Sequence, residues 1–198
     1  MNPLRPMLLA AALAIGPALA SSAFAQPVFF YAKDGVKIYG DFRRAEGSSR
    51  GTILLLPTQF PMWRQRLPMA ACSMQHAGPN AVWGSSYSSA LVFVVAARHP
   101  EVKALLAFSP AKYIQGYSIE KAAAKLSIPV FITSAPDGGE ISSGEALAKA
   151  VPDHRAVQYI PEDGVHGSST LQTDEDPRGA SENWKHVMAF LDSAFPRA

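Results

Sequence analysis

The chain has 198 residues, of which 48% are hydrophobic and 17% charged. This composition excludes a disordered protein and suits one domain that buries a core. The formal net charge of +2 is too small to favour nucleic acid or an anionic membrane as a partner. The single cysteine, Cys72, excludes an internal disulfide and a cysteine-rich metal site.

Residues 1–25 have the features of a secretory signal peptide. Arg5 supplies a positive charge, an apolar stretch follows over residues 7–19, and residues 23–25 form a small-x-small cleavage site. The apolar stretch is shorter than the roughly 20 residues of a transmembrane helix. We therefore expect a mature domain of residues 26–198 that is periplasmic or secreted and leaves the membrane after cleavage. An uncleaved membrane anchor is the alternative.

After the leader, strands alternate with helices along the chain. A hairpin comes first, with strands at 28–32 and 36–42 around turn-forming residues. Further strands are predicted from apolar runs at 52–56, 81–83, 102–108, 130–134 and 155–160. Helices are predicted at 87–98, 119–126, 143–151 and 182–194, the third capped by Ser142 or Ser143. This alternation predicts an α/β domain with a mostly parallel sheet and helices on both faces.

The most informative motif surrounds Ser86, where a predicted strand meets a predicted helix. Ser86 lies in a G-x-S-x-small frame, a close variant of the G-x-S-x-G nucleophile elbow. Small residues at Gly84 and Ser88 permit a sharp turn, and the backbone N–H of Tyr87 at the helix start faces a developing oxyanion. The frame indicates a nucleophilic serine. A serine-rich loop that only caps the helix is the alternative.

A serine nucleophile needs a histidine base, and the base needs a carboxylate that orients it. Asp137 and His166 each follow a predicted strand, so with Ser86 they lie at one edge of the sheet in the required chain order. Glu140 competes with Asp137, which could instead be a turn former. For His166 the alternative is a solvated loop residue. The other histidines lack this combination of order and edge.

The chain resembles the α/β-hydrolase superfamily, in the group of dienelactone hydrolases and small serine esterases. The resemblance rests on residues 51–56 (GTILLL), 83–88 (WGSSYS), 107–110 (AFSP), 129–135 (PVFITSA) and 164–169 (GVHGSS). It implies that Ser86 is the nucleophile, His166 the base and Asp137 its partner, with no cofactor or metal. Dienelactone hydrolases have a cysteine at the nucleophile position, so their lactone substrate is not implied.

The resemblance has a gap at residues 57–79. The family normally places an oxyanion loop, a helix, a strand and a second helix there, whereas this segment is long enough for one crossover. The expectation is therefore a fold that lacks one strand and one helix. The missing strand either leaves a break between the hairpin and the strand at 52–56 or forces a new pairing there. Gln59, or alternatively Phe60, stands where the family's second oxyanion donor follows that strand.

These features together predict an exported serine hydrolase whose partner is a small-molecule acyl substrate. The short connection between the strands at 102–108 and 130–134 leaves no room for a lid domain, which favours small or accessible carboxylic esters. A non-catalytic or degraded copy of the fold, acting as a binding protein or a relic, is the alternative that the shortened segment favours. A metallohydrolase fits less well, because no His-x-His or His-Glu-x-x-His spacing occurs.

Overall fold

The computed structural model describes residues 26–31, 37–44, 49–56 and 80–196. The signal-peptide prediction and the oxyanion prediction on Gln59, with its alternative Phe60, fall outside these residues. Among the helices that are described, none is both long enough and apolar enough to cross a membrane.

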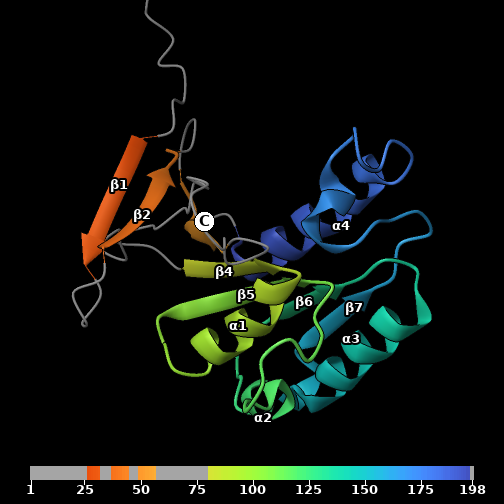
Figure 1. Cartoon of the computed structure of the whole chain (residues 1–198), viewed down its shortest axis with the longest axis horizontal. Helices are drawn as coiled ribbons and strands as arrows, with labels where there is room; N and C mark the ends of the chain where they lie inside the picture. The colour runs from red at the N-terminus through yellow and green to blue at the C-terminus, as the bar shows by residue number, and fades with distance from the viewer. Residues whose placement is uncertain (1–25, 32–36, 45–48, 57–79, 197–198) are drawn as a thin grey trace, which may run out of the picture.

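A five-stranded, all-parallel sheet forms the centre of the domain (Figure 1). Its strands lie side by side in chain order: β3 (Thr52–Leu55), β4 (Asn80–Ser85), β5 (Val102–Phe108), β6 (Val130–Thr133) and β7 (Ala156–Tyr159). The three middle strands are almost wholly buried, as their continuous apolar sequences predict. The predicted parallel sheet is confirmed.

Helices cover both faces of this sheet, as expected (Figure 1). On one face lie α1 (Tyr87–Ala96), α2 (Ile119–Ala123) and α3 (Gly138–Ala150), each of which connects two neighbouring strands. They share a face because connections of one hand that step across a sheet in one direction stay on the same side. The opposite face is covered by α4 (Ala180–Ala194). Two short 3-10 helices, η1 and η2, span Pro152–His154 and Gly167–Leu171.

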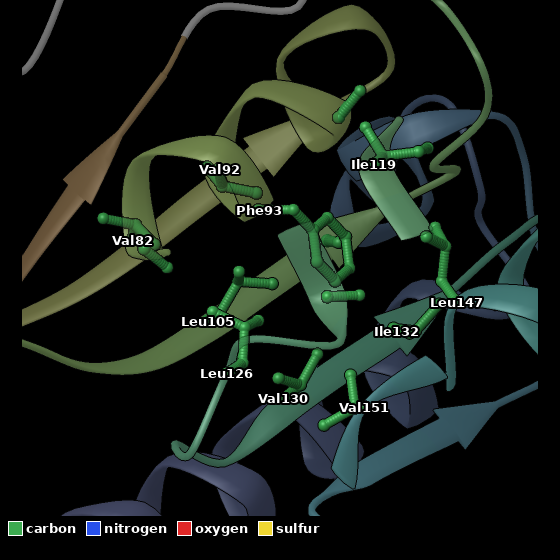
Figure 2. Packing of buried hydrophobic residues seen from close by; sticks show 14 of the residues in the cluster. Val82, Val92, Phe93, Leu105, Ile119, Leu126, Val130, Ile132, Leu147 and Val151 are labelled. Atoms are coloured by element: carbon green, nitrogen blue, oxygen red, sulfur yellow. The ribbon is translucent and has the colours of Figure 1, made fainter. Parts of the chain in front are cut away.

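The core is divided by the sheet into two layers. Under α1 to α3, the Phe93 ring is fully buried with Leu105 and Ile132 (Figure 2). Under α4 the layer is aromatic, and Trp83 stacks on Phe108 with ring centroids 4.4 Å apart. Because close-packed layers hold the sheet from both sides, the ends of its strands are held in fixed relative positions.

The N-terminal hairpin forms a sheet of its own. β1 (Gln26–Tyr31) and β2 (Lys37–Phe42) pair in antiparallel register. Within the described part of the chain, neither strand is hydrogen-bonded to β3, which forms the edge of the five-stranded sheet. Leu55 on β3 is accordingly 46% exposed. The expected absence of one strand and one helix concerns residues 57–79, which lie outside the described residues.

The start of α3 differs from the prediction. The sequence predicts a start at residue 143 with a serine cap, but the helix begins at Gly138 and its N-cap is Asp137. The Asp137 carboxylate accepts hydrogen bonds from the backbone N–H groups of Gly139 and Glu140, at 3.0 and 3.2 Å. It thereby satisfies two donors that have no partner within the helix. The two glycines conceal this start, because glycine is unfavourable inside helices.

Candidate active site

Ser86 occupies a strained turn between β4 and α1. Its backbone has φ 53° and ψ −121°, a region that residues with a side chain rarely adopt. The turn is held by its own backbone, because the Ser86 N–H donates to the Phe108 carbonyl and the Ser86 carbonyl accepts from the Ser89 N–H, both at 2.9 Å. The motif predicted this strand-to-helix turn, and the structure confirms it.

The two small residues of the motif, Gly84 and Ser88, are needed for different physical reasons. A Cβ atom on Gly84 would overlap the backbone of Ser88 and Ser89, so glycine is required there. The buried Ser88 hydroxyl accepts a hydrogen bond from the Ser85 N–H at 2.9 Å. Its Oγ atom lies 3.0 Å from the carbonyl oxygen of Ser85 and 3.1 Å from that of Leu56, and the hydroxyl can donate its proton to either. The serine at the last position of the frame therefore ties the turn to the end of β3.

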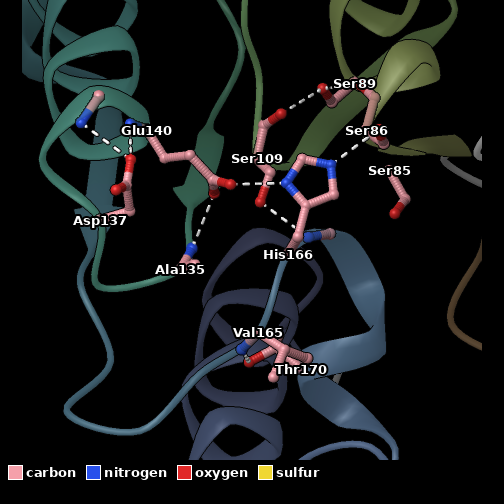
Figure 3. Close-up of polar contacts among 12 residues, drawn as sticks. Ser85, Ser86, Ser89, Ser109, Ala135, Asp137, Glu140, Val165, His166 and Thr170 are labelled. Atoms are coloured by element: carbon pink, nitrogen blue, oxygen red, sulfur yellow. Dashed lines mark hydrogen bonds and ion pairs between the residues drawn. The ribbon is translucent and has the colours of Figure 1, made fainter.

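His166 connects Ser86 to a carboxylate (Figure 3). Its Nε2 atom lies 2.8 Å from Ser86 Oγ, and its Nδ1 atom lies 2.6 Å from Glu140 Oε1. A carboxylate can only accept hydrogen bonds, so Nδ1 carries the imidazole proton and Nε2 accepts from the Ser86 hydroxyl. The structure thus brings Ser86 and His166 together, as the sequence predicts.

The carboxylate beside His166 belongs to Glu140, which corrects the prediction of Asp137. Asp137 is engaged as the cap of α3, and Glu140 follows in the first turn of that helix (Figure 3). From there its Oε2 atom accepts a hydrogen bond from the backbone N–H of Ala135 at 2.9 Å, just after β6. The sequence carried a signal for this, because Asp-x-x-Glu has the spacing of a helix capping box.

Glu140 is held in its ionised form. Burial raises the pKa of this carboxyl group, but hydrogen bonds from Ser109, His166 and the Ala135 N–H outweigh burial and leave the pKa below its ordinary value of 4.5. An ionised Glu140 fixes the orientation and the tautomer of the His166 imidazole at neutral pH.

Ser109 and Tyr113 also lie at this site, although the sequence indicated no role for either of them. Ser109 follows β5, is 1% exposed and has φ 52°. The Tyr113 hydroxyl donates to the Ser109 carbonyl at 3.1 Å and lies beside the Ser86 hydroxyl. Burial raises the pKa of Tyr113, so the phenol stays protonated at neutral pH. Ser109 belongs to the segment 107–110 that carries the resemblance, but that segment indicates no role for it. The positions of both residues at the site depend on where β5 ends.

Tyr87, the residue predicted to offer a backbone donor to an oxyanion, is the first residue of α1. It directly follows Ser86 at the positive end of the helix dipole, as the prediction requires. Among the residues that the structure describes, no group of three or more His, Cys, Asp or Glu side chains is placed to hold a metal ion.

Comparison with known proteins identifies the fold. No model of a known protein family and no curated protein sequence matches the chain. Among solved structures, the Pyrococcus furiosus esterase Pf2001 agrees with a TM-score of 0.62 at 14% identity, over 86% of this chain and 90% of the esterase. The chain has the α/β-hydrolase fold.

Two further structures show the extent of this similarity. The esterase domain of a Rhodothermus marinus protein agrees with the α/β-hydrolase fold of this chain at a TM-score of 0.52 and 13% identity, over 69% of this chain and 87% of that domain. For the Pyrococcus horikoshii acylaminoacyl peptidase, the TM-score is 0.46 at 13% identity, and the match covers 60% of this chain and 24% of the peptidase. At identities of 13% and 14%, the structural agreement with the two esterases shows the fold alone, and activity has to be argued from the site.

The lowered pKa of Glu140 predicts a pH-dependent contribution to stability. A carboxyl group whose pKa is depressed by folding stabilises the fold above its ordinary pKa, and this contribution is lost as pH falls through the lowered value. Urea unfolding of the native chain and of Glu140→Gln between pH 5 and pH 3 should show a gap in unfolding free energy that narrows as pH falls. A difference in unfolding free energy that stays constant between pH 5 and pH 3 would contradict a lowered pKa for Glu140.

Proposed function

We propose that this chain is an exported serine hydrolase that cleaves a small or accessible carboxylic ester, or a related acyl bond. The observation that carries the proposal is the connected series Ser86, His166 and Glu140, with contacts of 2.8 and 2.6 Å. A hydroxyl that donates to an imidazole, itself oriented by a carboxylate, is the arrangement that activates a serine. The α/β-hydrolase fold supports the proposal, and the export component rests on the leader-like residues 1–25.

In the first half of the proposed reaction, Ser86 Oγ attacks the carbonyl carbon of the ester. His166 Nε2 takes the hydroxyl proton as the new bond forms. The negative charge that develops on the carbonyl oxygen is stabilised by the Tyr87 N–H at the start of α1, with the Gln59 N–H proposed as the second donor. His166 then passes the proton to the leaving alcohol as its C–O bond breaks, and the acyl group remains on Ser86.

In the second half, a water molecule attacks the acyl carbon. His166 Nε2 takes a proton from this water and returns it to Ser86 Oγ as the bond between that oxygen and the acyl carbon breaks. The carboxylic acid leaves, and the free enzyme is restored with one water consumed. Glu140 stays ionised throughout and stabilises the imidazolium that forms twice in the cycle.

The exposure of the site supports an accessible substrate. The His166 side chain is 50% exposed. Between β5 and β6, a connection that the structure describes in full, the only helix is the five-residue α2. This connection therefore adds no lid domain that would enclose a long acyl chain.

The first test is covalent labelling of the full chain with a fluorophosphonate probe, with the adduct mapped by mass spectrometry. We expect one adduct on Ser86, because only an activated serine reacts quickly with such a probe. Ser86→Ala should abolish the adduct, and His166→Ala should slow labelling by at least about 10³-fold. A chain that is folded by circular dichroism and yet gives no adduct would favour the alternative, a non-catalytic protein with this fold.

A second prediction separates the two carboxylates of α3. Glu140→Gln should lower kcat for p-nitrophenyl acetate by about 10³- to 10⁴-fold, because it removes the group that orients His166 and stabilises the imidazolium. Asp137→Asn keeps a good helix cap and should leave kcat within about twofold. The reverse pattern would restore Asp137 as the partner of His166.

A third prediction concerns acyl length. If the site is open, kcat/KM for the palmitate ester should not exceed the value for p-nitrophenyl acetate or butyrate, because an unenclosed long chain contributes little binding energy. Rates measured below the solubility limit of each ester would check this. A clear preference for palmitate would contradict the assigned substrate class and leave the assignment of Ser86 intact.

A further inference from the structure

Two buried serines hold the loop that carries His166. Ser85 ends β4 and is 2% exposed, while Ser109 follows β5 and is 1% exposed. The Ser85 hydroxyl accepts a hydrogen bond from the Ser168 N–H, and the Ser109 hydroxyl accepts one from the Gly167 N–H, both at 2.8 Å. The two residues after His166 are therefore tied to two neighbouring strands.

These contacts replace an ordinary helix cap. His166 is the N-cap residue of η2, but its side chain makes no capping hydrogen bond, because the ring nitrogens contact Ser86 and Glu140 instead. The first N–H groups of a helix have no partner within that helix. Ser85 and Ser109 supply acceptors for two such groups from outside the helix, which leaves the imidazole available for its contact with the Ser86 hydroxyl.

The backbone near these contacts has little room for variation. Gly167 has φ 71°, and a Cβ atom built on it would lie 2.6 Å from Ser85 Oγ. Glycine is therefore required for the loop to approach this closely. Ser109 itself has φ 52°, a strained value that is held by a 2.7 Å hydrogen bond from its N–H to the Thr133 carbonyl. Such strain persists only where the surroundings impose it.

The two serines also contact the partners of His166. Ser85 immediately precedes Ser86. The Ser109 hydroxyl accepts from the Gly167 N–H (Figure 3) and also lowers the pKa of the Glu140 carboxyl group. The imidazole lies between these partners, so a shift of its loop changes both of its hydrogen bonds at once. A misplacement of about 1 Å can cost about 10²-fold in rate.

We infer that the hydroxyls of Ser85 and Ser109 are positioning groups for His166: by accepting hydrogen bonds from Ser168 N–H and Gly167 N–H, they set the imidazole between Ser86 and Glu140. This inference rests on the proposed function, since it concerns how the base of that reaction is held. Neither serine touches the substrate or donates a proton to it.

The test separates reaction rate from probe binding. Labelling of Ser86 by the fluorophosphonate probe is measured against probe concentration for the full chain and for Ser85→Ala and Ser109→Ala, which gives kinact and KI. We expect kinact to fall about tenfold in each variant, with KI within about twofold of the native value, because the probe site is unchanged and only the base is misplaced.

A matched control shows whether lost stability alone could lower the rate. Val151→Ala creates a cavity at the C-terminal end of α3, where the side chain is 4% exposed, far from the strand ends that carry the site. It should lower the urea midpoint of unfolding and leave kinact within about twofold. If Ser109→Ala does not fold, Ser109→Gly tests the same hydroxyl, because glycine adopts φ 52° without strain.

The outcomes distinguish this inference from the function on which it rests. A fall in kinact of about tenfold in both serine variants, with kinact of Val151→Ala within about twofold of the native value, supports the positioning role. Native kinact in folded Ser85→Ala and Ser109→Ala would overturn that role and leave the proposed hydrolase intact. A native chain that is not labelled at Ser86 would overturn the proposed function itself.

Discussion

The site depends on four neighbouring parallel strands, whose C-terminal ends lie side by side. Ser86 follows β4 and Ser109 follows β5. Glu140 lies in the first turn of α3, the helix that comes after β6, and His166 lies in the loop after β7. Strands in a parallel sheet are about 4.8 Å apart, so residues just beyond their ends lie within reach of each other's side chains. The positions of the candidate site residues are therefore set by the sheet and by the two core layers that pack against it.

Two residues with a strained backbone lie at these strand ends. Ser86 and Ser109 have nearly equal positive φ values of 53° and 52°, and each donates its N–H to the last residue of the next strand, to Phe108 and Thr133 respectively. These hydrogen bonds extend the pairing of the strands to the residue that turns away from them. The same structural device is thus used twice on adjacent strands, once to expose a hydroxyl and once to bury one.

The sequence predicted the parts of this arrangement that depend on local pattern. Continuous apolar runs identified the strands. The small residues around Ser86 and the chain order to His166 identified two of the three residues that lie in contact at the candidate site. Asp137 was wrong because the choice between it and Glu140 depends on where α3 begins, and two glycines masked that start. Ser109 could not be predicted, since its role follows from contacts with a loop 58 residues away in the chain.

The capping of α3 by Asp137 has a consequence for how the site responds to heat. The ends of a helix fray before its middle, and Glu140 occupies the first turn of this one. When the Asp137 cap opens, Glu140 loses its place beside His166 while the sheet and the core layers are still intact. Thermal inactivation would then precede global unfolding, and the width of the interval between the two would be set by a carboxylate that never contacts the imidazole.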